Sequence, residues 1–288
     1  MGRATPTRRR LAWLGLALWS TTAAAQDVTS AAMPAPSLVE QTLAAPWRFS
    51  ITPYFWATAL KGDVGLGRVE ADVDASFSDI WDSLNVAAML EAELWKGRFG
   101  LLSNTVYAQL EDNSASAENR LRLDTTADLL IQGLGAAYRA GTWQLADFEG
   151  AGPLSVSLDP YTGIRYTYLD LELKGRLDLP TLGIARERSE DGDRQWVDPL
   201  VGLRTIWTLG DHLNLIAAGD IGGTSTSDQF SWQAIGLLGY RFDLIGQDAN
   251  LVAGYRALKQ KYEDGDGRSA FKWDVIFHGP VVGLTITF

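Results

Sequence analysis

The chain has 288 residues and a formal net charge of −10, from 35 acidic and 25 basic side chains. This length allows one large domain or two small ones, and the acidic balance argues against nucleic-acid binding, which requires Lys and Arg at the phosphates. The absence of Cys excludes disulfides, a thiolate nucleophile and Cys-based metal sites. The 11 Trp and 9 Tyr suit membrane interfaces, because each side chain combines an apolar ring with one polar group.

The N-terminus has the features of a secretory signal peptide. Arg8–Arg10 precede an apolar run, Leu11–Trp19, and Ala23–Ala25 supply the small residues that precede a cleavage site. The run is much shorter than the roughly 20 residues of a membrane-spanning helix. We therefore predict a signal peptide over residues 1–25, whose removal takes four arginines away and changes the net charge from −10 to −14. A flexible periplasmic lead-in over residues 26–46 follows.

From Trp47 onward, apolar and polar residues alternate with a period of two between clusters of Gly, Asp and Asn, which is typical of strands joined by turns. The alternation extends through segment 120–140, for which both assignments of the outward face stay open. Short connections at 96–97, 209–212 and 243–248 alternate with longer polar ones at 111–119, 175–194, 222–229 and 263–269. Outer-membrane barrels have short periplasmic turns and long outer loops. The pattern therefore predicts an all-β fold, a transmembrane antiparallel up-and-down β-barrel over residues 47–288, although the connection 141–153 is long for its predicted periplasmic side.

The stretch from Lys61 to Leu84 decides the number of strands. Val69–Phe77 is typical of a strand, and Ser78–Leu84 is typical of a short helix with a Ser cap. Both chain ends of such a barrel are periplasmic, so the number of strands is even. We therefore assign the whole stretch to one outer connection, with its helix outside or inside the lumen, and expect about ten strands, with eight or twelve as alternatives.

The last segment ends on an aromatic residue, Phe288. Its apolar residues occupy odd positions from Phe271 to Phe277 and even positions from Val282 to Phe288. A constant outward face would therefore require a β-bulge at Gly279–Pro280, where Pro is tolerated because it has no N–H to donate. The bulge would turn Lys272, Asp274 and His278 into the lumen and away from lipid.

Alternation of the strands then predicts which charged side chains face the lumen. These candidates carry both signs, and the interior of a barrel of about ten strands is narrow. They are Arg48, Glu91, Glu93, Asp159, Arg165, Asp198, Arg204, Asp220, Arg241, Arg256, Lys272, Asp274 and His278. Two interpretations stay open: ion pairs that fill a small interior, or a narrow polar conduit whose charges select solutes.

Residues for catalysis are few. His278 and Asp274 share one face of the last segment, and an Asp–His pair is what a general base requires, so they are the weak catalytic candidates. His212 is expected to be a turn residue. Asp264–Gly267 resembles part of a calcium loop but lacks the closing Glu of an EF-hand, and the alternating glycines of Gly62–Gly67 have no following helix to hold a phosphate. We therefore expect no cofactor and no metal.

Several motifs resemble a family of largely uncharacterised bacterial outer-membrane β-barrel proteins, which are small porin-like or surface-antigen-like barrels. The motifs are Ile51–Ala57, Gly62, Phe77–Ile80, Leu84 and Trp95–Leu101. They cover the N-terminal third, and the rest of the chain is similar as a generic barrel with a terminal Phe. The resemblance implies the fold and an outer-membrane location of Gram-negative type, and it implies no catalytic residues.

The sequence thus favours a monomeric integral outer-membrane barrel that is structural or a narrow passive pore for small solutes. The first alternative is an outer-membrane enzyme, an omptin-like or lipid-modifying hydrolase, that acts through His278 and Asp274. The second is a surface adhesin that acts through the outer loops. The expected partners are outer-membrane lipid and lipopolysaccharide, and the barrel-assembly machinery, which would recognise the last strand and Phe288.

Overall fold

The computed structural model describes residues 44–67, 69–115, 121–148, 152–179, 184–225, 227–267 and 269–288. The predicted signal peptide, and the lead-in as far as residue 43, lie outside the described residues. The elements in chain order are β1 (Trp47–Trp56), β2 (Ala59–Leu66), β3 (Val69–Ala75), α2 (Phe77–Ser83), β4 (Leu84–Lys96), β5 (Phe99–Ala115), β6 (Leu121–Tyr138), β7 (Gly141–Phe148), β8 (Gly152–Leu179), β9 (Ile184–Leu209), β10 (Leu213–Ser225), β11 (Gln229–Leu244), β12 (Gln247–Asp264) and β13 (Phe271–Thr287). The described part of the chain holds no helix long and apolar enough to cross a membrane.

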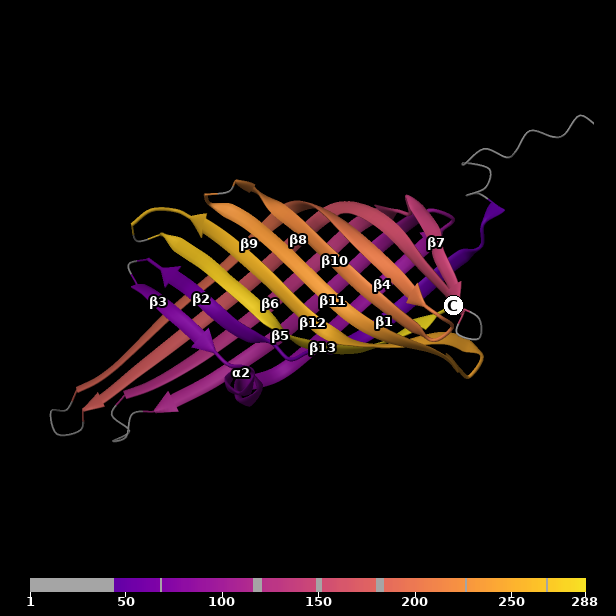
Figure 1. Ribbon diagram of the computed structural model, residues 1–288. Coiled ribbons are helices and arrows are strands. Elements are labelled where there is room, and N and C mark those ends of the chain that lie inside the picture. The colour runs from indigo at the N-terminus through magenta and orange to yellow at the C-terminus, as the bar shows by residue number, and fades with distance from the viewer. Residues whose placement is uncertain are drawn as a thin grey trace, which may run out of the picture. The chain divides into compact units, whose positions relative to one another are not determined.

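The strands close into an antiparallel barrel (Figure 1). Around the ring the order is β1, β4, β5, β6, β8, β9, β10, β11, β12 and β13, and β13 pairs again with β1. The ring therefore has the ten strands expected from the sequence. Closure leaves no free sheet edge in the ring, so the backbone groups of the wall are paired, as a membrane requires. The end with the short turns and Phe288 is the turn end, and the opposite end is the loop end.

The stretch 61–84 is, as predicted, one connection between the first two strands of the ring, β1 and β4, and its two strands also extend the wall. Trp56 lies opposite Val281 and Ala59 lies opposite His278, so β2 continues the path of β1 along β13 without a change of register. β3 then returns beside β2. Between β1 and β2 the pairing lapses beside Pro280, which has no N–H to donate, although Ala57 still donates to its carbonyl at 2.9 Å.

Helix α2 lies on the outer face of the wall, so it does not plug the lumen. Ser76 caps it: the Ser76 Oγ accepts from the Asp79 N–H at 3.4 Å, and the Asp79 carboxylate accepts from the Ser76 N–H at 2.8 Å. Hydrogen bonds from the hydroxyl and then the backbone of Ser76 hold the pKa of the Asp79 carboxyl below its usual value. The helix has no buried residue. Phe77 and Trp81 pack edge-on against the outward-facing Phe55, at 6.1 and 5.7 Å between ring centroids.

The long connection 141–153 forms much of an additional hairpin at the turn end. Its first part is β7, which pairs with the beginning of β8 and has an irregularity between Gln144 and Ala146. β7 lies outside the ring order, so it does not change the number of strands in the barrel.

The β-bulge predicted at Gly279–Pro280 is wrong. β12 and β13 pair residue by residue without interruption from Asp264 opposite Phe271 to Asp248 opposite Thr287. Buried residues occupy the odd positions of β13 from Phe271 through Val281, so the even positions face outward from one end of the strand to the other. The expectation failed because it assumed that every large apolar side chain of the strand meets lipid.

Lys272, Asp274 and His278 therefore face outward and not into the lumen. They do not lie against the centre of a bilayer. Ten residues from Phe288 to His278, at roughly 3.3 Å each and tilted by about 40°, rise about 25 Å, which is the height of the apolar band of such barrels. His278 thus marks the loop-end border of the apolar band, and the two charged residues lie beyond it.

Candidate functional site

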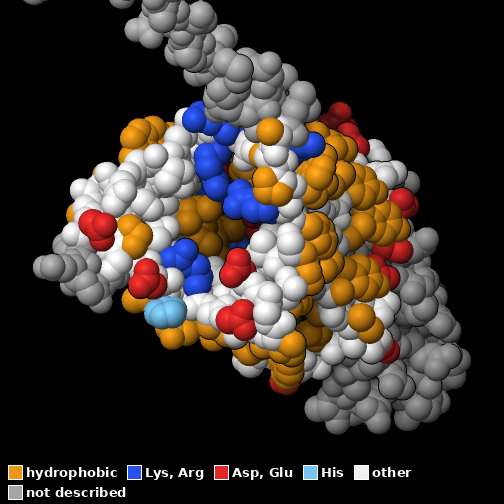
Figure 2. Space-filling view, turned by 90° about the vertical axis from the view of Figure 1, so that its right-hand side faces the viewer, with side chains coloured by type: hydrophobic (Ala, Val, Ile, Leu, Met, Phe, Trp, Pro, Cys, Tyr) orange, Lys and Arg blue, Asp and Glu red, His pale blue; other side chains and the backbone are white. Residues whose placement is uncertain are grey.

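The lumen contains a cavity of about 760 Å³ at the turn end. Its lining includes rim residues of that end, among them His212, Asp248 and Thr287. Figure 2 views the molecule from this end and shows the hollow, with basic and acidic side chains around it. Both the size and the mixed lining are within the range of small-molecule sites.

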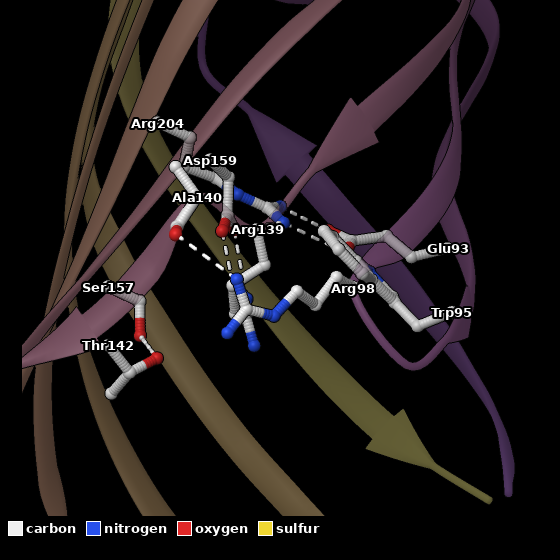
Figure 3. Close-up of polar contacts among 9 residues, drawn as sticks. All are labelled: Glu93, Trp95, Arg98, Arg139, Ala140, Thr142, Ser157, Asp159 and Arg204. Carbon is white, nitrogen blue, oxygen red and sulfur yellow. Dashed lines mark hydrogen bonds and ion pairs between the residues drawn. The ribbon is translucent and has the colours of Figure 1, made fainter. Parts of the chain in front are cut away.

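A first layer of charges crosses the lumen inside this cavity (Figure 3). Arg204 on β9 forms an ion pair with Glu93 on β4, with Nη2 donating to Oε2 at 3.2 Å, although β5, β6 and β8 lie between these strands in the wall. Arg204 also donates to Asp159 at 3.2 Å, and Arg139 donates two hydrogen bonds of 2.9 Å to the same carboxylate. Each acid of this layer is therefore neutralised by at least one guanidinium.

The indole of Trp95 completes this layer. Its Nε1 donates to Glu93 at 2.6 Å. The guanidinium carbons of Arg139 and Arg204 lie 4.8 and 5.7 Å from its ring centroid, within the range of cation–π interactions. The ring thus contacts both guanidinium groups while its N–H binds the Glu93 carboxylate.

A second layer lies nearer the loop end and centres on Arg256 of β12. Its guanidinium donates to Tyr54 Oη at 2.9 Å, to Asn104 Oδ1 at 3.3 Å and to Gln233 Oε1 at 2.6 Å. It also lies 4.5 Å from the ring centroid of Trp56. These partners stand on β1, β5 and β11, so a single side chain connects separate parts of the wall.

Arg165 and Gln260 add further connections across the lumen. Arg165 Nη2 donates to Asp220 at 2.7 Å, and Tyr161 Oη donates to the same carboxylate at 3.1 Å. Gln260 on β12 donates to Thr167 on β8 at 2.7 Å, and both side chains are fully buried. The bond from Gln260 therefore connects β12 to β8, four strands away in the ring.

Beyond these layers, apolar side chains fill the lumen toward the loop end. They form one packed cluster in which Leu258 and Val275 have no solvent exposure. The buried members are Trp56, Val106, Ile131, Leu169, Trp196, Leu258, Phe271, Trp273, Val275, Phe277 and Val281. The lumen is thus polar and hollow at the turn end and apolar and filled further along.

Ten of the thirteen charged residues predicted to face the lumen lie on inward faces. The structure brings Glu93, Asp159 and Arg204 together, and separately Arg165 and Asp220. Arg48, Glu91, Arg241 and Arg256 line the cavity. Asp198 is fully buried and accepts a hydrogen bond from Gln229 at 2.8 Å.

The two weak catalytic candidates have different partners on the outer wall. His278 Nδ1 lies 2.7 Å from Tyr255 Oη, and Asp274 forms an ion pair with Lys259. His212 lines the cavity, and its Nδ1 lies 3.0 Å from the Arg241 carbonyl oxygen. Among the residues that the structure describes, no group of three His, Cys, Asp or Glu could hold a metal ion.

Sequence reasoning missed several residues that build the two charged layers. Tyr54 and Trp95 share inward faces with Arg48 and Glu93, so alternation within those segments could have identified them. Arg139 lies within the segment 120–140, whose outward face was left open. Asn104 was missed because its inward neighbours on β5 are apolar, which suggested a lipid-facing surface.

No family model matches the chain, and no curated protein matches it. Solved structures of bacterial outer-membrane barrels are similar in fold. The outer-membrane protease OmpT of Escherichia coli is 9% identical with a TM-score of 0.50, over 85% of this chain and 98% of that chain. Ail of Yersinia pestis is 7% identical with a TM-score of 0.32, over 85% and 99%. A FadL homologue of Pseudomonas aeruginosa is 10% identical with a TM-score of 0.29, over 84% and 89%.

At these identities the likeness concerns the fold alone. The similarity to OmpT supports the fold of an antiparallel barrel, and it transfers no catalytic residue. The chain is therefore an antiparallel ten-stranded barrel of the kind found in bacterial outer membranes.

Proposed function

We propose that this protein is an integral outer-membrane barrel that is closed to passive diffusion and presents a binding cup to the periplasm. The short turns are the periplasmic side of such barrels, so the turn-end cavity would open to the periplasm. A cleaved signal peptide over residues 1–25 would deliver the chain there. Of the two forms expected from the sequence, a structural barrel and a narrow pore, the geometry favours the closed one.

The observation that carries this proposal is the filled half of the lumen. Arg256 connects β12 to β5 through Asn104, Gln260 connects β12 to β8, and the cluster that includes Trp273 and Phe277 packs beyond them. A hydrated ion would lose its water shell in such an apolar layer, which costs several kcal/mol or more without compensating partners. Hydrophobic constrictions of this kind stop conduction by excluding water.

Planar-bilayer recording of the purified full chain tests the proposal. We expect no regular conductance steps from the wild type at any voltage. The double substitution Trp273→Ala with Phe277→Ala removes two rings from the cluster and should produce steps. Ile276→Ala, which faces outward on the same strand, should stay silent. Regular steps from the wild type would overturn the closed barrel in favour of a narrow pore.

A second variant with a shortened side chain replaces the double variant if the double variant does not fold. Where the double variant fails to show the heat-dependent gel shift of a folded barrel, Leu258→Ala on β12 shortens one fully buried side chain and takes its place. A folded Leu258→Ala or double variant that stays silent, like the wild type, would mean that the apolar cluster is not what closes the lumen.

The proposed partners follow from the outer surface. The apolar band would contact lipid, and the charged residues beyond His278, such as Lys272, would meet lipopolysaccharide head groups. Phe288 stacks on Phe49 with ring centroids 6.2 Å apart and is 59% exposed, so the assembly machinery could reach it. A monomer is sufficient for this arrangement, because the ring closes within one chain.

A further inference from the structure

The turn-end cavity has one apolar wall, which is unusual for a hydrated lumen. Ile206, Ile216 and Leu237 are direct neighbours across β9, β10 and β11 and all line the cavity. Ala218 and Ile235 form the next inward pair on β10 and β11. The interior of a water-filled barrel is normally polar, so this wall is suited to an apolar body and not to water.

The facing wall is polar. Ser50 and Thr52 of β1, Thr285 of β13 and Asn104 of β5 line it. Thr52 and Thr285 are linked by a hydrogen bond of 2.8 Å. The cavity thus offers an apolar surface on one side and hydroxyl and amide groups on the other.

Arg241 lies at the mouth of the cavity, on the same strand as Leu237. Its Nη2 donates to the Gly210 carbonyl at 2.9 Å, which fixes the side chain against the β9–β10 turn. Its Nε is buried and has no hydrogen-bond partner. No ion pair joins Arg241 to a carboxylate among the described residues, whereas Arg204 and Arg165 have such partners. The guanidinium therefore carries a charge without a counter-ion among the described side chains, and an anionic ligand in the cavity would supply one.

The acidic side chains of the mouth restrict which anion fits. Asp211, Asp243 and Asp248 line the same cavity, and Asp243 accepts a hydrogen bond from the Gly246 N–H at 3.1 Å. They would repel a polyanion. A single compact anionic group can reach Arg241 while an apolar remainder extends toward Leu237 and Ile216.

We infer that the cavity binds a small amphipathic monoanion from the periplasm, with its carboxylate or similar group at Arg241 and its apolar body on the wall of Ile206, Ile216 and Leu237. This inference rests on the proposed function, because it takes the cup as open at the turn end and closed beyond. The volume of about 760 Å³ accommodates a ligand with an aromatic ring or a short alkyl chain.

The test uses the full chain in nanodiscs of zwitterionic lipid and three water-soluble probes, with binding measured by calorimetry. Phenylbutyrate has both the ring and the anion, phenylbutylamine has the ring with a cation, and butyrate has the anion without the ring. We expect saturable binding of phenylbutyrate, about tenfold tighter than either of the others, since phenylbutylamine lacks the anion for Arg241 and butyrate lacks the ring for the apolar wall. Protein-free nanodiscs correct for partition into lipid.

Two variants separate the anion from the apolar body. Arg241→Gln should abolish the preference for phenylbutyrate over phenylbutylamine, and Ile216→Asn should weaken both aromatic probes. The matched controls are Arg98→Gln, at the rim but outside the cavity lining, and Leu215→Ala, which faces outward beside Ile216. Both controls should bind like the wild type.

Absence of saturable phenylbutyrate binding by the folded wild type, or unchanged binding by both Arg241→Gln and Ile216→Asn, would overturn the inference. The conductance of the same preparations keeps the two proposals distinct. A silent barrel without binding contradicts only the ligand, whereas regular conductance steps contradict the closed barrel whether or not the probe binds.

Discussion

Arg204 and Glu93 form an ion pair across the lumen, from β9 to β4, although three strands of the wall separate them. Their side chains are only 13% and 15% exposed. The contact therefore fixes the distance between two opposite parts of the barrel in a way that the hydrogen bonds within the wall do not.

Removing one partner of this pair should destabilise the barrel. Arg204→Met removes the guanidinium that pairs with both Glu93 and Asp159 in a partly buried site. Breaking a buried ion pair by removing one partner lowers the free energy of unfolding by about 3–5 kcal/mol. The free energy of unfolding in urea, followed by the heat-dependent gel shift, measures the effect. The double substitution Arg204→Met with Glu93→Leu should recover part of the loss.

The matched control is the exposed pair of Lys61 and Asp74, whose side chains are 60% and 70% exposed. Lys61→Met should leave unfolding unchanged, because exposed ion pairs contribute little. Equal destabilisation by Arg204→Met and Lys61→Met would show that the lumen pair has no special structural role.

The unbroken register of β13 can be tested by chemical labelling. The chain has no Cys, so single cysteines can be introduced without background reaction. Asp274→Cys should react with a membrane-impermeant maleimide on the folded barrel, because this position faces outward beyond the apolar band. Val275→Cys, at a position with no exposure, should stay unlabelled until the protein is unfolded. Labelling of position 275 and protection of position 274 would instead support a β-bulge at Gly279–Pro280.

Gly279 allows the close approach of β13 to the junction of β1 and β2. A Cβ at this position would lie 1.8 Å from the Ala57 carbonyl oxygen. Gly279→Ala should therefore lower the free energy of unfolding by about 1–3 kcal/mol or more, as overpacked side chains do. Gly236→Ala is the control, because a Cβ there meets nothing within 4 Å. The free energies of unfolding of both variants in urea test this expectation. Similar values would mean that β13 does not lie close enough to Ala57 to exclude a Cβ.

Phe288 should matter more for assembly than for stability. Its backbone exchanges hydrogen bonds with Phe49 at 2.8 and 3.2 Å, and these remain when the ring is removed. Phe288→Ala and Phe49→Ala should each lose an aromatic contact of about 0.5–1.5 kcal/mol in the refolded protein. In cells, only Phe288→Ala should reduce the amount of folded barrel in the outer membrane. Equal reductions would argue against recognition of the terminal Phe.

Much of the architecture could be predicted from alternation alone. A period of two in segment after segment, short turns alternating with long connections and a final aromatic residue indicated a closed barrel of about ten strands, and the structure confirms that fold. Ten of the thirteen charged candidates lie inward for the same reason. Successive side chains of a strand point to opposite faces, so charged residues that alternate with an apolar outward face point into the lumen.

The failures concern the half of the lumen that is apolar. Trp273 and Phe277 appeared to belong to the lipid face, because hydrophobicity does not distinguish lipid from a packed interior. Only the register of β13 against β12 and β2 shows that these rings point inward and that Asp274 points outward. His278 and Asp274 therefore both face outward, where each contacts a different partner, and they do not form a pair in the lumen.

The sequence by itself determined the period of the strands and the approximate positions of the turns, since these depend on neighbours along the chain. It left the outward face open at 120–140 and assigned the wrong face to the apolar residues from Phe271 to Phe277. Which strands face one another across the lumen depends on ring closure. The pairing of Arg204 with Glu93, the bridge from Arg256 to Tyr54 and the apolar wall beside Arg241 were therefore decided only by the tertiary structure.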